Sequence, residues 1–152
     1  MKPTQPFIPG PVLGIETSCD ETAAAVVVSG RVVASRIASQ VPLHQRFGGV
    51  VPEIASRNHL LTILPTIEAV LADAGLKGQD LAGLAVTNRP GLIGALLVGV
   101  QTAKTLAMTW SVPIVGVHHI QAHCWAALLQ PPNYQGDDWP SPSLPLLAVP
   151  ST

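Results

Sequence analysis

The 152-residue sequence contains few charged residues and carries almost no net charge. Lys, Arg, Asp and Glu occupy 11% of the positions, under half of the roughly 25% that is usual in soluble domains. With a formal net charge of -1, the chain shows no basic stretch that would attract nucleic acid by itself. A role on RNA would therefore need other evidence.

Cysteine is also scarce, and long apolar runs are missing. Cys19 and Cys124 are too few and too far apart for a disulfide framework or a zinc ribbon, and they fit a reducing compartment. The longest apolar stretch, residues 92–100, is far shorter than the roughly 18 to 20 residues of a membrane span. Residues 1–11 contain four prolines and no apolar core of a signal peptide, so we expect a flexible extension. These features predict a soluble, cytoplasmic protein.

The first half of the chain predicts strands followed by a long helix. Three adjacent antiparallel strands are expected at residues 12–15, 22–29 and 31–39. The helix is expected to begin at Pro52, where proline suits the first turn, and to kink or break at Pro65. Gly75 would end the helix. The residues expected to pack on the sheet are Leu60, Leu64, Ile67 and Leu71.

The second half of the chain alternates strands and helices. Strands are expected at residues 81–87 and 113–117, helices at 91–110 and 119–129, and a further apolar run follows at 144–149. This alternation is typical of an α/β fold with parallel strands. Small residues recur every four positions in the first of these helices and would let a neighbouring backbone approach closely: Gly91, Ala95, Gly99, Ala103 and Ala107.

A polar turn after the first strand is one candidate functional site. Residues 16–22 place three hydroxyl side chains and three carboxylates together. Such a turn could hold a metal-bound phosphate or an acyl-adenylate, with Asp20 or Glu21 acting on a proton. The same residue types are ordinary in a hairpin turn, so both interpretations stay open.

Two histidines form a second candidate site. His119 and His123 are four residues apart in a predicted helix, so their rings share one face and could bind one cation. A zinc protease would need glutamate directly after the first histidine, where this chain has Ile120. Two ligands make an incomplete site, and the pair could also be structural. The loop at residues 87–91 could hold phosphate through its backbone donors.

Together these segments resemble the TsaD family of tRNA adenosine threonylcarbamoyltransferases, formerly described as O-sialoglycoprotein endopeptidases. The resembling segments, in the family's order, are residues 14–22, 44–59, 90–99 and 118–123. The resemblance implies an α/β fold, the N-terminal lobe of an actin-like ATPase of the ribonuclease H type. In this lobe, expected at residues 12–152, a mixed sheet is flanked by helices.

The resemblance also implies a chemistry. His119 and His123 would bind one divalent metal, iron or zinc, which would hold and polarise threonylcarbamoyl-adenylate. The exocyclic amine of the adenosine next to the tRNA anticodon would then attack the carbonyl of that substrate. Asp20 and Glu21 would be the catalytic residues near the reacting groups. The implied substrate contacts are Thr17, Ser18 and Gly91.

The partners implied are tRNA, an adenylate-forming enzyme and a paralogous TsaB-type subunit that docks on the first lobe, with no membrane involved.

Three departures from the family bear on this interpretation. Arg89 stands where glycine is usual in the phosphate-binding loop, and Ala122 replaces a common glycine of the metal motif. Residues 144–149 look like the strand before a second Ser-Gly-Gly phosphate loop, but the chain continues with Pro150 and ends at Thr152.

From this third departure we expect the second lobe to be absent, together with an aspartate metal ligand. The chain would then be a truncated and catalytically incomplete transferase. One competing hypothesis is a non-catalytic single-lobe module that pairs with a TsaD-family partner. Another is a metallopeptidase.

Overall fold

The fold is built on one mixed five-stranded sheet. The structure, a computed structural model, describes residues 9–126 and 128–134. Its strands are β1 (Pro11–Glu16), β2 (Glu21–Val28), β3 (Arg31–Ser39), β4 (Gly83–Arg89) and β5 (Ile114–His118). Its helices are α1 (Val41–Gln45), α2 (Pro52–Ala74), the short 3-10 helix η1 (Gly78–Asp80), α3 (Ile93–Trp110) and α4 (His119–Ala126). The predicted strands and long helices within this range are confirmed, with small shifts at their ends.

The strand order across the sheet is β3-β2-β1-β4-β5. β1, β2 and β3 pair antiparallel, whereas β1, β4 and β5 run parallel. Ser29 and Gly30 both have positive φ at the tight turn between β2 and β3, which suits the twist of a hairpin. Parallel neighbours need longer crossovers, and α2 and α3 supply them. The predicted division into an antiparallel first half and a parallel second half is therefore confirmed.

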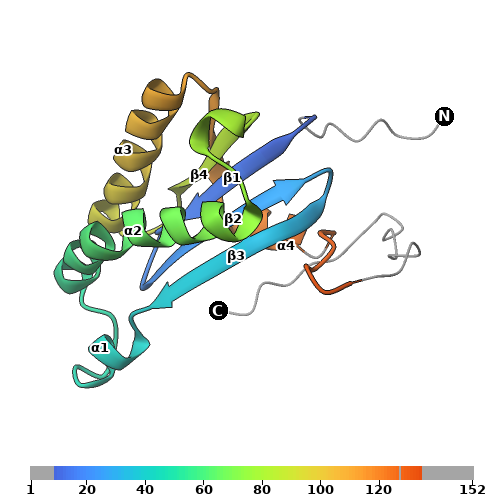
Figure 1. Cartoon of the computed structure of the whole chain (residues 1–152). Coiled ribbons are helices and arrows are strands. Elements are labelled where there is room, and N and C mark those ends of the chain that lie inside the picture. Colours follow the sequence, from blue (N-terminus) through green and yellow to red (C-terminus); the bar gives the residue numbers. More distant parts are fainter. Residues whose placement is uncertain (1–8, 127, 135–152) are drawn as a thin grey trace.

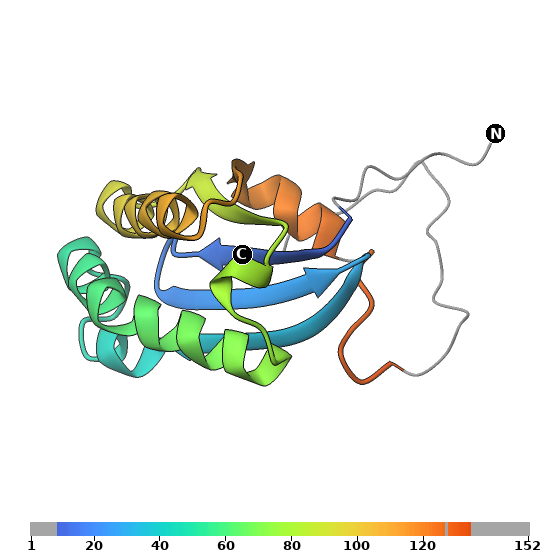
Figure 2. The same cartoon turned by 45° about the horizontal axis from the view of Figure 1, so that its top comes forward.

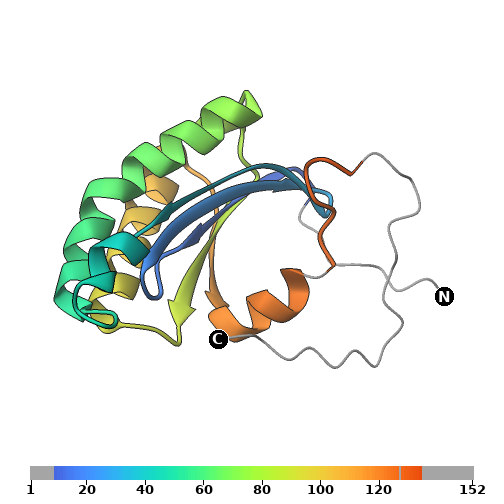
Figure 3. The same ribbon diagram turned by 90° about the horizontal axis from the view of Figure 1, so that it is seen from below.

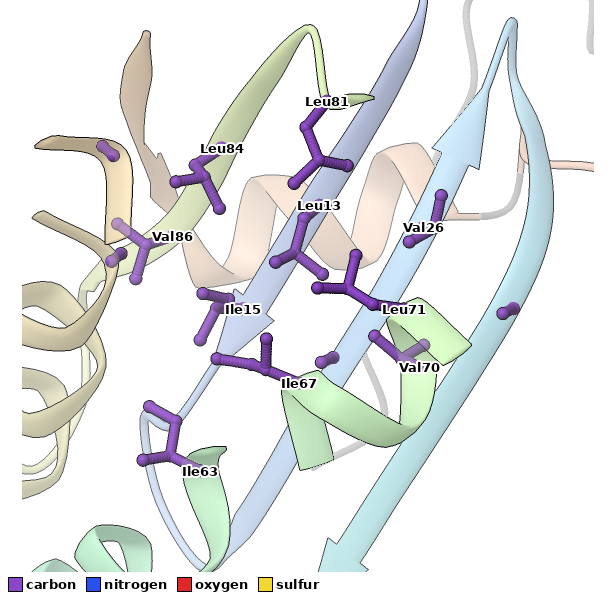
Figure 4. Close-up of a cluster of buried hydrophobic side chains, with 14 residues drawn as sticks. Leu13, Ile15, Val26, Ile63, Ile67, Val70, Leu71, Leu81, Leu84 and Val86 are labelled. Carbon is purple, nitrogen blue, oxygen red and sulfur yellow. The ribbon is translucent and has the colours of Figure 1, made fainter. Parts of the chain in front are cut away.

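Helices α2 and α3 cover one face of the sheet, and α4 lies on the opposite face (Figures 1 and 3). Figure 2 shows α2 and α3 lying next to each other, in contact. The core lies between these two helices and the sheet (Figure 4). Its larger residues are Leu13, Ile15, Val26, Leu84 and Val86 of the strands and Ile63, Ile67, Val70 and Leu71 of α2. Because side chains alternate along a strand, the last residue of β1, Glu16, faces the side on which α4 lies.

The buried face of α2 differs from the predicted one. Ile67 and Leu71 are buried as expected, but Leu60 is 64% exposed and Leu64 is 50% exposed. The buried face instead includes small and polar residues, which a search for leucines at helical spacing does not find: Ala55, His59 and Thr66. Pro65 lies on the exposed side, and α2 continues through it, so the expected break is absent.

Four of the five small residues, Ala95, Gly99, Ala103 and Ala107, lie on the buried face of α3, whereas Gly91 is exposed and precedes the helix. Ala95 and Ala103 are fully buried, and Gly99 packs against the turn that follows β1. A Cβ at Gly99 would lie 2.3 Å from Oγ1 of Thr17, closer than any real contact. The small side chains therefore allow α3 to approach the sheet and the polar turn closely.

Two sequence-based expectations fall on residues outside the described ones: most of the N-terminal extension, at residues 1–8, and the apolar run at 144–149. None of the helices in the described part of the chain combines the length and apolar character that a membrane crossing requires.

Candidate functional site

Three parallel strands end at the same edge of the sheet, and the candidate site lies there. Glu16 is the last residue of β1, Arg89 of β4 and His118 of β5. Because these strands are parallel neighbours, their carboxyl ends bring together residues that are far apart in the sequence. Ligands of open α/β sheets commonly bind at this edge.

The two histidines predicted as metal ligands face each other at this edge. Helix α4 starts at His119, directly after β5, and His123 follows one turn later. Their Nε2 atoms are 3.1 Å apart, and the rings are nearly perpendicular, at 80°, with centroids 4.5 Å apart. The four-residue spacing therefore brings both imidazoles to one point.

This geometry fits two ligand positions of a divalent metal. Two nitrogen ligands, each about 2.05 Å from a tetrahedral zinc ion, lie about 3.3 Å apart, close to the separation of the two Nε2 atoms. Within residues 9–126 and 128–134, however, no three or more His, Cys, Asp and Glu side chains are arranged to hold a metal ion. Catalytic zinc sites usually have three protein ligands, so the described residues supply part of such a set.

Glu16 is hydrogen-bonded to the first histidine. Its Oε2 lies 3.0 Å from Nδ1 of His119 and accepts a hydrogen bond from the hydroxyl of Thr87 at 2.5 Å. Its Oε1 accepts a hydrogen bond from the backbone N–H of Ser18. Burial acts to raise the pKa of Glu16, but the hydrogen bonds from Ser18, Thr87 and His119 together outweigh burial and lower this pKa below its usual value. The group is therefore a carboxylate at neutral pH and places a negative charge beside His119.

The polar turn after β1 packs against the start of α3. Thr17 is fully buried, and its hydroxyl donates to the carbonyl of Ala95 at 2.9 Å. The backbone N–H of Leu92 donates to the carbonyl of Ser18 at 2.8 Å. A Cβ at Gly91 would lie 2.6 Å from that carbonyl oxygen, so this contact requires a glycine. The absence of a side chain at Gly91 thus has a packing reason.

Of the three predicted substrate contacts, Ser18 lies next to the histidine pair. Its Oγ is 3.2 Å from Nδ1 of His119, whereas the hydroxyl of Thr17 is used within the fold. The structure brings Thr17, Ser18 and Gly91 together. Of the three, within the described residues, only Ser18 has a side chain in contact with one of the predicted metal-binding histidines, His119.

The two predicted catalytic carboxylates lie further along the turn. Asp20 is half-buried between β1 and β2, and Glu21 is exposed at the start of β2. Neither side chain hydrogen-bonds to His119 or His123 within the part of the chain that the structure describes. Burial, together with the negative charge of Asp20, raises the pKa of the neighbouring Cys19 thiol, which makes this thiol a poor nucleophile at neutral pH.

Two further histidines are buried and hold the polar turn to other elements. His59 is fully buried: its Nε2 donates to the Cys19 carbonyl at 3.0 Å, and its Nδ1 lies 2.7 Å from the Thr22 hydroxyl. The Gln40 side chain connects His59 to His44 through contacts of 3.3 and 3.2 Å. Burial lowers the pKa of His59 and outweighs the hydrogen bond to Cys19. His59 therefore belongs to the packed face of α2.

The sequence patterns single out the histidine pair but not the residues that hold it. The contact between Glu16 and Thr87 depends on the parallel pairing of β1 with β4, which no local pattern encodes. The sequence contains one indication of the role of Glu16. Side chains alternate along a strand, so the buried Leu13 and Ile15 place Glu16 on the face of the sheet opposite the core. Arg89, one of the residues that depart from the family pattern, is exposed at the end of β4, where it pairs with His118 of β5 after a shift in register.

The chain matches a known family and proteins in it. The family model described as TsaD, tRNA N6-adenosine threonylcarbamoyltransferase, matches residues 31–147. A Crocosphaera subtropica protein of that name is 55% identical over 136 residues, which are 90% of this chain and 38% of that protein. A Thermomicrobium roseum protein of the same name is 51% identical over 139 residues, which are 91% of this chain and 38% of that protein. The chain thus spans under two fifths of the length of these curated relatives.

Among solved structures, YeaZ from Pseudomonas aeruginosa has a similar fold. The TM-score is 0.55 at 19% sequence identity, over 72% of this chain and 43% of that chain. The likeness concerns the fold alone. It agrees with the predicted α/β fold, in which a mixed sheet is flanked by helices.

Proposed function

The chain belongs to the TsaD family of tRNA N6-adenosine threonylcarbamoyltransferases, and we propose that it forms the metal-binding N-terminal lobe of such an enzyme. The reaction is transfer of the threonylcarbamoyl group from threonylcarbamoyl-adenylate to the adenosine next to the anticodon of tRNAs. The observation that carries the proposal is the convergence of His119 and His123 at the carboxyl edge of the sheet, inside the segment that matches the family.

The residues at this edge suit the proposed chemistry. Nε2 of His119 and Nε2 of His123 would hold the divalent metal, iron or zinc. When bound, the metal supplies a Lewis acid that polarises the carbonyl group under attack. The Ser18 hydroxyl, next to the pair, would contact the adenylate. Asp20 or Glu21, in the same turn, would accept the proton that the attacking amine loses, and the adenylate part of the substrate would leave as AMP.

The 152-residue polypeptide assayed alone is proposed to have negligible transferase activity. Its described residues supply two metal ligands, and a catalytic site of this kind usually has three from the protein. We also expect the chain alone to bind tRNA weakly, because binding to the tRNA phosphates needs clustered positive charge and the net charge of this chain is only -1. Binding of tRNA would depend on further protein surface.

A chimeric enzyme tests the transferase proposal. In the Crocosphaera subtropica relative, the 136 matched residues are replaced by those of this chain, so that the relative supplies the remaining protein. We expect this chimera, given threonylcarbamoyl-adenylate and unmodified tRNA, to form threonylcarbamoyladenosine that mass spectrometry detects. The matched control is the chimera with His119→Ala and His123→Ala, which should form none. A folded chimera without product, beside an active relative, would refute the proposal.

The proposed partners are tRNA, an adenylate-forming enzyme and a TsaB-type subunit that docks on this lobe in the cytoplasm. Helices α2 and α3 leave large apolar side chains in solvent, which is unusual for a monomer and typical of an interaction surface. These exposed residues are Leu60, Leu61, Leu64, Ile93 and Leu97. Leu61→Asp should abolish capture of a TsaB-type subunit, and the matched control Glu68→Asp, which changes an exposed polar residue of the same helix, should not.

The same exposed side chains also favour a second candidate function. A non-catalytic single-lobe module would use them to pair with a TsaD-family partner and would need no metal. Such a module should bind a divalent ion no better than its His119→Ala, His123→Ala variant. Metal affinity therefore distinguishes the two candidates.

A further inference from the structure

We propose that Glu16 is a positioning residue that keeps the hydrogen of the His119 ring on Nδ1 and so leaves the Nε2 lone pair facing His123. The proposal rests on the proposed function in one respect only, which is that Nε2 is the atom that would face a metal. It adds a residue from β1 to a site whose ligands both come from α4.

The first step concerns which atom donates the hydrogen bond between Glu16 and His119. Oε1 of Glu16 accepts from the backbone N–H of Ser18, and Oε2 accepts from the hydroxyl of Thr87. These donors favour the ionised form, and an ionised carboxylate has no hydrogen to donate, so Glu16 acts as an acceptor only. The 3.0 Å contact between Oε2 and Nδ1 therefore requires the hydrogen to be on the histidine nitrogen.

The second step concerns the other ring nitrogen. A neutral imidazole carries one N–H, so a hydrogen on Nδ1 of His119 leaves a lone pair on Nε2. This Nε2 lies 3.1 Å from Nε2 of His123. A lone pair directed at that point is what a divalent cation requires from a histidine ligand. Carboxylates that accept from the remote nitrogen of a ligating histidine fix its tautomer and orient its ring in this way.

The third step concerns rigidity. Glu16 is anchored by the pairing of β1, a central strand, with β2 and β4 on its two sides. Thr87 is almost completely buried at the end of β4. The side chains of Glu16 and His119 are 30% and 28% exposed, so water screens their interaction only in part. The sheet, rather than α4, thus determines how His119 is oriented.

Nuclear magnetic resonance of the whole chain, labelled with ¹⁵N-histidine, tests the proposal without a metal. The His119 ring should show the Nδ1–H tautomer in the unchanged chain, and Glu16→Gln should shift it toward Nε2–H. The matched control Glu68→Gln alters an exposed carboxylate of α2 and should leave the His119 signals unchanged. A His119 ring in the Nε2–H form, or one unaffected by Glu16→Gln, would overturn the proposal.

A second variant keeps the test decisive if Glu16→Gln does not fold. Thr87→Val preserves the shape of the side chain and removes one donor to Oε2 of Glu16. We expect it to shift the His119 tautomer in the same direction by a smaller amount. An unchanged tautomer in a folded Thr87→Val chain, with Glu16→Gln unfolded, would count against the proposal.

Zinc titration by calorimetry measures the consequence for metal binding. Glu16→Gln should bind zinc about 10- to 100-fold more weakly than the unchanged chain, as loss of an outer hydrogen-bond partner usually does. Equal affinities would overturn the positioning role and leave the metal site in place. A tautomer that depends on Glu16 in a chain that binds no zinc would support the positioning role and refute the proposed metal site.

Discussion

Contacts between single atoms hold the polar turn (residues 16–22) against α3. A substitution that adds one carbon atom at these contacts should therefore disturb the packing. A Cβ at Gly91 would meet the Ser18 carbonyl, and a Cβ at Gly99 would meet the Thr17 hydroxyl. The hydroxyl of Thr17 in turn donates to Ala95 of α3. The polar turn can therefore lie beside the histidine pair only because Gly91 and Gly99, which face the turn, have no side chains.

Substitution of Gly99 by alanine should destabilise the chain. Its new methyl group would lie 2.3 Å from Oγ1 of the fully buried Thr17, so α3 or the turn must move. We expect a loss of about 1–3 kcal/mol in the free energy of unfolding, the usual cost of overpacking, measured by urea denaturation. Gly49→Ala is the matched control, because a Cβ there meets nothing within 4 Å. Equal stabilities of the two variants would show that the turn does not depend on this contact.

The sequence could predict the histidine pair, because a helix converts a four-residue spacing into a shared face. It could not predict that Glu16 and Thr87 support this pair. These two residues are separated by 71 positions and meet through the register of two parallel strands. The histidines are thus a local feature of the sequence, whereas their support is a property of the assembled sheet.

Among the elements, α2 shows most clearly where a sequence pattern misleads. Leucines at helical spacing predicted its buried face, but the packed side runs through Ala55, His59 and Ile63. His59 is buried because its ring nitrogens meet the Cys19 carbonyl and the Thr22 hydroxyl. A polar residue with complete hydrogen bonding can replace an apolar one in the core. Such partners are known only once β2 and the polar turn are placed.

The stability of the chain should depend on pH through His59. Burial lowers the pKa of His59 in the folded chain below the ordinary value of 6.5. Between these two values the unfolded chain binds more protons, so stability is full above pH 6.5 and decreases as the pH falls toward the folded-state pKa. Glu16 and Asp73 also have lowered pKa values in the folded chain. Their contribution to stability is lost only as the pH falls below their ordinary pKa values of 4.5 and 3.8.

Urea denaturation between about pH 5 and pH 7 measures this dependence. His59→Gln should show a smaller decrease in unfolding free energy over this range than the unchanged chain. His123→Gln, which removes an exposed histidine, serves as the control and should retain the decrease. Parallel pH profiles of His59→Gln and the unchanged chain would exclude His59 as the cause.

Pro65 gives a second prediction for α2. It lies inside the helix on the exposed side, where proline cannot donate its backbone hydrogen bond and alanine can. Pro65→Ala should raise the unfolding free energy by up to about 3 kcal/mol, the difference in helix propensity. Thermal denaturation followed by circular dichroism measures the change. A lower midpoint would mean that the proline ring makes a packing contribution larger than its cost.

At the scale of the whole molecule, the fold class could be predicted from the order of strands and helices. Alternation in the second half indicates parallel strands, and parallel strands place their carboxyl ends at one edge. The side of the sheet on which α4 lies could not be derived from local patterns, because it depends on the face that α2 and α3 leave uncovered (Figure 3). That placement brings α4 to the same side as Glu16 and completes the site described above.

The central claim is that His119 and His123 together bind a divalent metal. Calorimetric titration of the metal-free whole chain with zinc tests it most directly, beside the His119→Ala, His123→Ala variant. The account predicts binding of one zinc ion by the unchanged chain and loss of that binding in the variant. Equal binding by both chains, or none by the unchanged chain, would contradict the claim.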